Sequence, residues 1–172
     1  AIYIDTEGTF RPERILEICE YRGLDPRRAL EGVLCIRTRS RDQQLFALSE
    51  IARGKLREAK LVVLDTVTGL FTGYREIRER RRYMGRLLRA LLDLLEYASK
   101  ESMAVVLCNR PSGERGRAVG DPYIASAVSY RVLISRGPGA IRSALLVHSP
   151  TGERRSCAFE IREEGVVDAH AH

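Results

Sequence analysis

Residues 1–14 of the chain read AIYIDTEGTFRPER. The apolar run over residues 1–5 predicts a buried β-strand, and Pro12 predicts the first turn of a helix. Glu7 stands between these two elements, so its carboxylate follows the carboxyl end of a strand. Open parallel α/β sheets assemble their ligand sites at that end of their strands. The opening segment therefore predicts an α/β fold and makes Glu7 a candidate functional residue.

Strands and helices alternate along the first two thirds of the sequence. The apolar patterns predict strands at residues 1–5, 33–37, 61–64 and 104–108. The intervening segments predict helices at 12–22, 26–32, from Asp42 as the cap to about Leu56, and 76–100. This alternation favours a parallel sheet with right-handed crossover connections.

The pattern changes after about residue 120. A short helix is expected from Asp121, and three further strands at 128–135, 143–148 and 157–161 are joined by short turns. Such turns predict an antiparallel β-meander. The predicted fold class is therefore α/β, with a mainly parallel sheet flanked by helices and a C-terminal meander. We expect one domain over residues 1–168 and a disordered tail at 169–172.

The composition is that of a soluble intracellular protein. With 172 residues and 44% hydrophobic residues, the chain can bury a core of its own. It has no run of about 18 apolar residues and no signal-peptide pattern at its start, so we expect no membrane association. The four cysteines form no CxxC pair and are expected to be buried, reduced thiols. Because residue 1 is Ala, the sequence is expected to be processed, excised or incompletely recorded.

Positive charge is concentrated in two segments. The net charge is +6, and only Lys55, Lys60 and Lys100 are lysines, so arginine supplies most of the basic residues. Residues 75–89 contain seven arginines against two glutamates, and residues 110–117 contain three against one. Arginine suits phosphate recognition, which favours contact with a DNA backbone, with Tyr74 and Tyr83 as stacking partners. The alternatives are a solvated helix face for the first segment and an ordinary surface loop for the second.

Three polar residues stand where predicted parallel strands end. Glu7, Asp65 and Asn109 each follow an apolar strand, so a parallel sheet would bring them to one edge. A strand ending in Asp, here LVVLD, is typical of nucleotide hydrolases that hold a magnesium shell, and a nearby Glu can activate water. The alternative for Asp65 alone is a residue that caps a turn.

Taken in order, several blocks resemble the ATPase core of the RadA-type recombinases, archaeal and eukaryotic relatives of bacterial RecA. The blocks are IDTEGTFRPER, LVVLDTVTGLF, AVVLCN, IASAVSYRV, HSPTGE and FEIREEGVVD. The resemblance implies a RecA-like core that binds ATP and Mg²⁺, binds single-stranded and double-stranded DNA, and acts in DNA repair and homologous recombination. It also implies self-association into a filament or ring, or pairing with a related recombinase subunit, and a cytoplasmic, nucleoid-associated location.

The resemblance assigns roles to individual positions. Glu7 would be the catalytic, water-activating residue, Arg14 would lie against the adenine ring, and Asp65 would hold magnesium. Asn109 and Arg110 would contact the nucleotide after the fourth strand, while Ser149 and Pro150 would cap ATP from a neighbouring subunit. The segments 72–82 and 110–120 match the family's two DNA-binding loops. The DNA-binding candidates are Arg75, Arg78, Arg80, Arg81, Arg82, Arg110, Arg115 and Arg117.

The sequence also departs from this family pattern. It contains no GxxxxGK[ST] phosphate loop, and its only Gly-Lys pair, Gly54-Lys55, falls inside a predicted helix. Arg110 replaces the family's glutamine, and His148 replaces an acidic residue. We therefore expect part of a recombinase whose phosphate-loop strand is missing from this sequence, so that the isolated chain would not hydrolyse ATP. The alternatives are an inactive paralogue that binds DNA or a recombinase as a regulator, and another RecA-like ATPase acting outside recombination.

Overall fold

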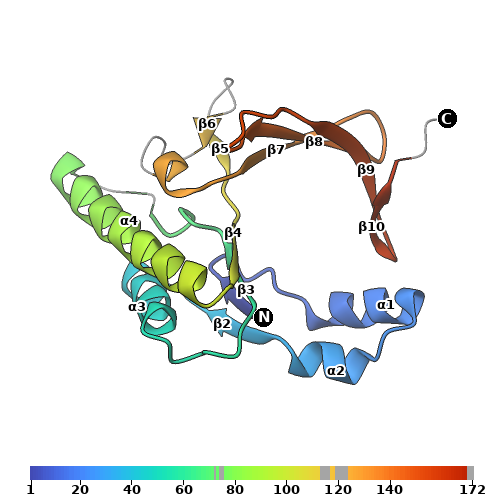
Figure 1. Cartoon of the computed structure of the whole chain (residues 1–172), viewed down its shortest axis with the longest axis horizontal. Helices are drawn as coiled ribbons and strands as arrows, with labels where there is room; N and C mark the ends of the chain where they lie inside the picture. The colour runs from blue at the N-terminus through green and yellow to red at the C-terminus, as the bar shows by residue number, and fades with distance from the viewer. Residues whose placement is uncertain (72, 74–75, 113–116, 119–123, 170–172) are drawn as a thin grey trace. The chain divides into compact units, whose positions relative to one another are not determined.

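The computed structural model describes residues 1–71, 73, 76–112, 117–118 and 124–169. The chain divides into two compact units, each with its own sheet. The first unit contains Ala1–Phe10 and Gly32–Ala127, and the second contains Arg11–Glu31 and Val128–His172. Figure 1 labels the elements of both units. A single domain over residues 1–168 stays a prediction, and the expected tail lies outside the described residues apart from Ala169.

A four-stranded parallel sheet forms the centre of the first unit. Its strands are β1 (Ile2–Asp5), β2 (Leu34–Arg37), β3 (Leu61–Asp65) and β4 (Ala104–Leu107), in the order β2-β1-β3-β4. All three neighbouring pairs run parallel, as predicted from the alternation of strands and helices. The register places Asp5 opposite Asp65, so the carboxyl ends of β1 and β3 are level with one another.

Two helices cover one face of this sheet. They are α3 (Arg41–Ala52) and α4 (Ile77–Lys100), which lie side by side in Figure 1. The helix-facing residues of β1 and β3 alternate along each strand and are fully buried, as Ile4 and Leu64 illustrate. The predicted apolar stripe of α4 packs against them through Met84, Leu87, Leu91, Leu94 and Ala98. Truncating one of these leucines to Ala would cost about 2–5 kcal/mol of stability.

The start and end of α3 differ from the predicted ones. The cap is Ser40, whose side chain accepts a 3.2 Å hydrogen bond from the Gln43 amide, and Asp42 lies within the first turn. Ser40 has the extended backbone that a cap requires, whereas Asp42 is already helical. The helix ends at Ala52, and Gly54 beyond it has φ +76°, a conformation that favours glycine. Gly54-Lys55 is therefore not inside a helix.

The second unit joins two helices to an antiparallel sheet. It contains α1 (Pro12–Arg22) and α2 (Pro26–Glu31), with strands β7 (Arg131–Arg136), β8 (Ile141–His148), β9 (Ser156–Arg162) and β10 (Gly165–Asp168) in the order β10-β9-β8-β7. The meander is confirmed. Strand β10 was not predicted, because only the two residues Glu163 and Glu164 separate it from β9.

Three short elements lie between β4 and β7. Two short strands, β5 (Pro111–Ser112) and β6 (Arg117–Ala118), pair with each other, and a 3₁₀ helix, η1, covers Ala125–Ala127. The start of the helix expected from Asp121 lies outside the described residues. All four cysteines are free thiols, but the prediction that all are buried was wrong. Cys35 and Cys157 are exposed, and the side chain of Cys35 points away from the face that α3 and α4 cover.

Candidate functional site

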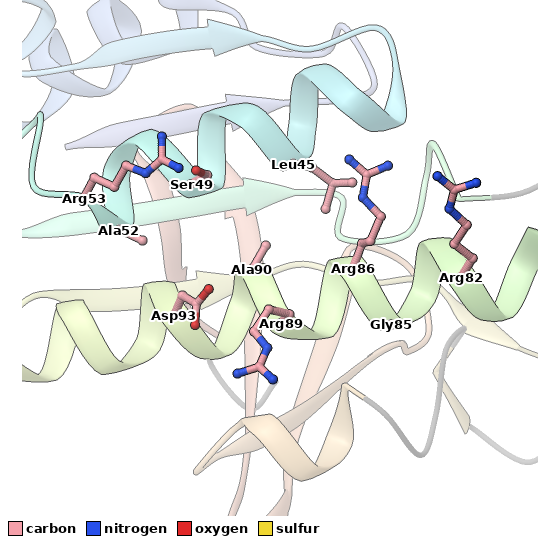
Figure 2. A pocket seen from close by; sticks show the side chains of 10 residues that line it. All are labelled: Leu45, Ser49, Ala52, Arg53, Arg82, Gly85, Arg86, Arg89, Ala90 and Asp93. Atoms are coloured by element: carbon pink, nitrogen blue, oxygen red, sulfur yellow. The ribbon is translucent and has the colours of Figure 1, made fainter.

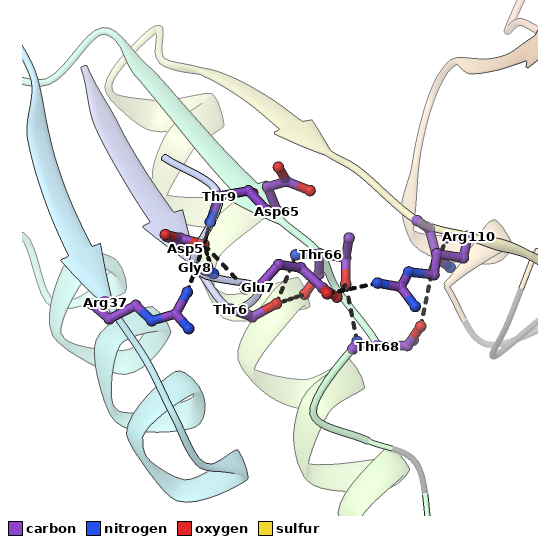
Figure 3. Close-up of polar contacts among 12 residues, drawn as sticks. Asp5, Thr6, Glu7, Gly8, Thr9, Arg37, Asp65, Thr66, Thr68 and Arg110 are labelled. Carbon is purple, nitrogen blue, oxygen red and sulfur yellow. Dashed lines mark hydrogen bonds and ion pairs between the residues drawn. The ribbon is translucent and has the colours of Figure 1, made fainter. Parts of the chain in front are cut away.

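The carboxyl ends of β1, β3 and β4 bring Glu7, Asp65 and Asn109 to one edge of the sheet, as predicted. The Glu7 carboxylate contacts the residues that directly follow Asp65 and Asn109 in the sequence (Figure 3). Thr66 Oγ1, directly after Asp65, donates a 3.0 Å hydrogen bond to Glu7 Oε1. The Arg110 guanidinium, directly after Asn109, lies 2.6 Å from Glu7 Oε2. The three strand ends are therefore joined through the Glu7 carboxylate.

Asp5 fixes the turn that carries Glu7. Its carboxylate is buried, with a residue exposure of 4%, and accepts hydrogen bonds from four successive backbone amides. The amides of residues 7, 8 and 9 donate to Oδ1 over 3.0, 2.7 and 3.3 Å, and that of residue 10 donates to Oδ2 over 3.3 Å. Arg37 adds a 2.9 Å ion pair from β2. Charge-assisted bonds of this kind are strong, so the turn is held in one geometry.

Asp5 was not predicted as a residue of the site. A signal was present, because an Asp followed by Thr-Glu-Gly has the composition of a turn in which a side chain accepts backbone amides. Gly8 within this turn has φ +79°, and a Cβ there would lie 2.6 Å from an Arg37 nitrogen. A glycine is therefore required both for the backbone conformation and for the approach of Arg37.

Asp65 at the end of β3 has one oxygen engaged. Its Oδ2 accepts a 2.6 Å hydrogen bond from the Tyr3 hydroxyl on the neighbouring strand. Burial, and then this hydrogen bond, raise the pKa of Tyr3 far above its ordinary value, so the phenol remains a donor. Burial also raises the pKa of the Cys108 thiol, and the charge of Asp65 adds to that shift. Within the described part of the chain, Asp65 Oδ1 has no hydrogen-bond partner.

Hydroxyl groups connect the loop after β3 to the other strand ends. The Thr66 amide donates to Thr6 Oγ1 over 2.8 Å, and Thr6 Oγ1 donates to the Thr66 carbonyl over 3.2 Å. Thr68 Oγ1 donates to Asn109 Oδ1 over 2.7 Å, and the Arg110 amide donates to the same oxygen over 3.0 Å. Asn109 thus positions the main chain of Arg110.

Gly69 lies against the Glu7 carboxylate, with no room for a side chain between them. Its amide donates a 3.1 Å hydrogen bond to Thr66 Oγ1. A Cβ at this position would lie 2.4 Å from Glu7 Oε1 and 2.6 Å from Thr66 Oγ1. Any side chain larger than hydrogen would therefore displace Glu7. No signal in the single sequence distinguishes this glycine from one in an ordinary turn.

A family model described as Rad51 matches residues 1–169. The chain belongs to the Rad51 family. It is 32% identical to the DNA repair and recombination protein RadA of Cenarchaeum symbiosum (strain A) over 183 residues, which covers 99% of this chain and 45% of that protein. The RadA of Methanococcus voltae is 32% identical over 182 residues, covering 98% of this chain and 55% of that protein. The chain spans about half the length of the curated relatives that it matches.

Two other groups of residues that the Rad51-family resemblance singled out lie in the second unit. The Arg14 guanidinium bonds to Glu17 Oε2 over 2.8 Å and to the carbonyls of Arg162 and Glu163. It therefore helps to hold α1 against the turn between β9 and β10, and its contact with adenine stays a prediction. Ser149 is buried and donates to the Glu153 carbonyl over 3.2 Å, while Pro150 is exposed. The nucleotide-capping role of this turn also stays a prediction.

The arginines predicted to bind DNA are described only in part. Arg78, Arg80, Arg81 and Arg82 are exposed near the start of α4, and none forms an ion pair with a described residue. Arg75 and Arg115 lie outside the described residues, and Arg117 belongs to β6. Arg110 points to Glu7 (Figure 3), so the structure places it at the strand ends. Contact between these arginines and DNA stays a prediction.

An open basic groove of about 720 Å³ runs between α3 and α4 (Figure 2). Its arginines are Arg53, Arg82, Arg86 and Arg89, with Asp93 as the only acidic residue among those that line it. Arg86 also pairs with Asp42 over 3.0 Å. Arg82 is therefore part of a positive surface that combines α4 arginines of the predicted segment 75–89 with Arg53, which directly follows α3.

The described residues contain neither a membrane-spanning helix nor a cluster of metal-binding side chains. None of the helices in the described ranges has the length and apolar character that crossing a membrane requires. Over the same ranges, no group of three or more His, Cys, Asp or Glu side chains could hold a metal ion by itself.

Proposed function

We propose that this chain is the catalytic-core portion of an ATP-dependent recombinase that binds single-stranded DNA, assembles into filaments and promotes strand exchange. The observation that carries the proposal is the position of Glu7 and Asp65 after adjacent parallel strands, at the same carboxyl edge of the sheet, in a chain of the Rad51 family. On this proposal the partners are DNA and further recombinase subunits, and the protein is intracellular and associated with the nucleoid.

Glu7 is proposed to take a proton from water. Its turn is fixed by Asp5, and its side chain is 23% exposed, so it is both positioned and accessible to solvent. A general base must lie within hydrogen-bonding reach of the proton that it removes. A fixed carboxylate at the strand edge suits that requirement.

Asp65 is proposed to contribute to a magnesium site. Mg²⁺ in phosphoryl-transfer sites is commonly held by one or two carboxylates together with phosphates and water, rather than by a cage of protein ligands. One oxygen of Asp65 is bound by Tyr3 and the other has no partner among the described residues, so the residue fits this mode. When bound, the ion would neutralise charge on the phosphates.

Hydrolysis on this proposal needs a phosphate-binding loop that the 172 residues do not contain. The sequence has no GxxxxGK[ST] segment, whose backbone amides would cradle the phosphates. We therefore propose that the chain supplies Glu7 as the base and Asp65 as the magnesium-site carboxylate. The phosphate-binding loop would come from polypeptide outside these 172 residues.

The test is phosphate release by the natural full-length protein in the presence of single-stranded DNA. Glu7→Gln should lower the rate by about 10²–10⁴-fold, the usual contribution of general base catalysis. Glu58→Gln is the matched control, because Glu58 is an exposed glutamate far along the sequence. The isolated 172-residue chain should release no phosphate above background. DNA-stimulated release from the pure isolated chain would refute the need for a separate loop.

A second candidate is a regulator that keeps the fold but not the hydrolysis. The contact that favours it is the ion pair between Arg110 and Glu7, which occupies the proposed base. A regulator would bind DNA or a recombinase subunit, and its full-length form would release phosphate no faster than its Glu7→Gln variant.

A further inference from the structure

We propose that Arg110 is a phosphate-binding residue whose guanidinium, when no phosphate is bound, blocks the Glu7 carboxylate. When Arg110 binds a phosphate, its guanidinium would leave Glu7, so the phosphate would replace the Glu7 carboxylate as its partner. The inference rests on the proposed function only for the role of Glu7 as a base. The exchange itself rests on contacts of the strand edge.

Both oxygens of Glu7 are occupied. Oε1 accepts from Thr66 Oγ1 over 3.0 Å, and Oε2 accepts from the Arg110 guanidinium over 2.6 Å. The Thr66 hydroxyl is neutral, and it also accepts from the Gly69 amide, so it belongs to the fixed frame of the loop. The Arg110 contact is the one that can be given up. Until it is, the Arg110 guanidinium takes one of the acceptor positions of Oε2 and offsets the negative charge that a base needs.

The ion pair between Arg110 and Glu7 is one that a phosphate can displace. The Arg110 side chain is 66% exposed, and it bonds to Glu7 through a single nitrogen. Arginine carries five donors in a planar fork, which matches the paired oxygens of a phosphate group. Exposed ion pairs are weakly held, so a phosphate that accepts two such bonds can compete with one carboxylate oxygen.

Arg37, the other arginine at this edge of the sheet, differs from Arg110 in how firmly it is held. Arg37 pairs with Asp5, whose side chain is only 5% exposed and which also accepts four backbone amides. Removing Arg37 from that position would leave a buried carboxylate with one fewer partner. Arg37 is therefore a fixed structural ion, whereas Arg110 is free to move.

Movement at Arg110 is confined to its side chain. Its amide is held by Asn109 Oδ1, which Thr68 also contacts. Pro111 follows directly, and a proline restricts the residue before it to extended conformations. The guanidinium can thus turn between Glu7 and an incoming anion without a change in the strand end.

The ligand is an anion of the phosphate class. A terminal phosphate of a nucleotide and a phosphodiester of a nucleic acid present the same oxygens to a guanidinium. Arg110 lies between the strand edge and the segment that begins with β5, so the exchange is open to either source. In both cases the consequence is the same, because a bound phosphate takes Arg110 away from Glu7.

The test measures anion binding by the 172-residue chain at low ionic strength, with inorganic tripolyphosphate and a short oligodeoxythymidylate as separate probes. Glu7→Gln removes the competing charge and should tighten binding of at least one probe by about threefold, the scale set by an exposed ion pair. Glu7→Gln combined with Arg110→Gln should show no such gain. Gain with tripolyphosphate alone identifies a nucleotide phosphate as the source, and gain with the oligonucleotide alone identifies a nucleic acid backbone.

Glu96→Gln is the matched control. Glu96 pairs with Lys100 over 2.7 Å, and the two side chains are 70% and 68% exposed, so the substitution makes the same charge change and also releases an exposed cation. The proposal is overturned if Glu7→Gln binds both probes no more tightly than Glu96→Gln, or if the gain survives Arg110→Gln. Loss of hydrolysis plays no part in this readout, so failure of the proposed function and failure of the exchange are separate results.

Discussion

The Tyr3 hydroxyl donates a 2.6 Å hydrogen bond to Asp65 Oδ2, from one strand of the parallel sheet to the next. Tyr3 pairs in register with Val63, so the bond reaches forward by two residues to the end of β3. The Phe10 ring lies 5.0 Å from the Tyr3 ring, centroid to centroid. The phenol is thus packed by the turn that carries Glu7 while it orients Asp65.

Replacing Tyr3 with Phe should keep the ring packing and free Asp65 Oδ2. Because the acceptor is a charged carboxylate, we expect a loss of about 1–3 kcal/mol in the free energy of unfolding. Urea denaturation at pH 7 measures it. Tyr130→Phe is a suitable control, since Tyr130 is 62% exposed, and it should change the stability by much less.

The same pair predicts a loss of stability in alkali. The pKa of Tyr3 is raised in the folded protein, first by burial and then by the bond to Asp65, so the unfolded chain releases the phenolic proton at a lower pH. The stabilising contribution is present below pH about 10 and is lost as the pH rises further. The difference in unfolding free energy between wild type and Tyr3→Phe should therefore shrink above pH 10. A constant difference from pH 8 to pH 11 would contradict this.

Gly69→Ala should displace the Glu7 carboxylate without disturbing the core. The new methyl group would meet Glu7 Oε1 and Thr66 Oγ1, both closer than 3 Å. In the full-length protein we expect the rate of phosphate release to fall at least tenfold. Gly85→Ala in α4 is the control: a Cβ there has nothing within 4 Å, and alanine should stabilise the helix by about 1 kcal/mol. Equal activity of the two variants would remove Gly69 from the site.

Asp5→Ala should unfold the Glu7 turn. The substitution leaves four backbone amides and the Arg37 guanidinium without their acceptor, for which we expect a loss of about 3–5 kcal/mol. Chemical denaturation monitored by circular dichroism gives the value. Asp93→Ala serves as a control because Asp93 is exposed on α4. We expect this substitution to change the free energy of unfolding by close to zero.

Neutralising Arg80, Arg81 and Arg82 together tests the start of α4. If all three contact phosphates, the slope of log affinity against log salt for single-stranded DNA should become shallower by about 2. The control is the triple glutamine variant at Arg27, Arg28 and Arg154, three exposed arginines of the second unit that remove the same charge. Equal slopes in the two variants would place the α4 arginines outside the DNA interface.

The sequence was sufficient for the architecture because strand and helix patterns are local. α1 was predicted with both ends correct, since Pro12 and Gly23 are strong start and stop signals. The meeting of Glu7, Asp65 and Asn109 followed from one rule, that parallel strands end at the same edge. The family assignment followed from contiguous blocks rather than from isolated letters.

The contacts within the site were not predictable in the same way. The pairing of Arg110 with Glu7 joins residues 103 positions apart, and no local pattern states which arginine would reach which carboxylate. The role of Asp5 was not predicted because it depends on the backbone conformation of residues 7–10, which brings four amides to one carboxylate. Ser40 rather than Asp42 caps α3 because backbone conformation, which the sequence does not state, decides between two neighbouring cap formers.

The conformation of the turn before α1 depends on one side chain, the Asp5 carboxylate. A loss-of-function screen would score damage at Asp5 and damage at Glu7 as the same phenotype, although one collapses a loop and the other removes a chemical group. Thermal melting of each purified variant would separate the two classes, and only inactive variants that melt at the wild-type temperature report on chemistry.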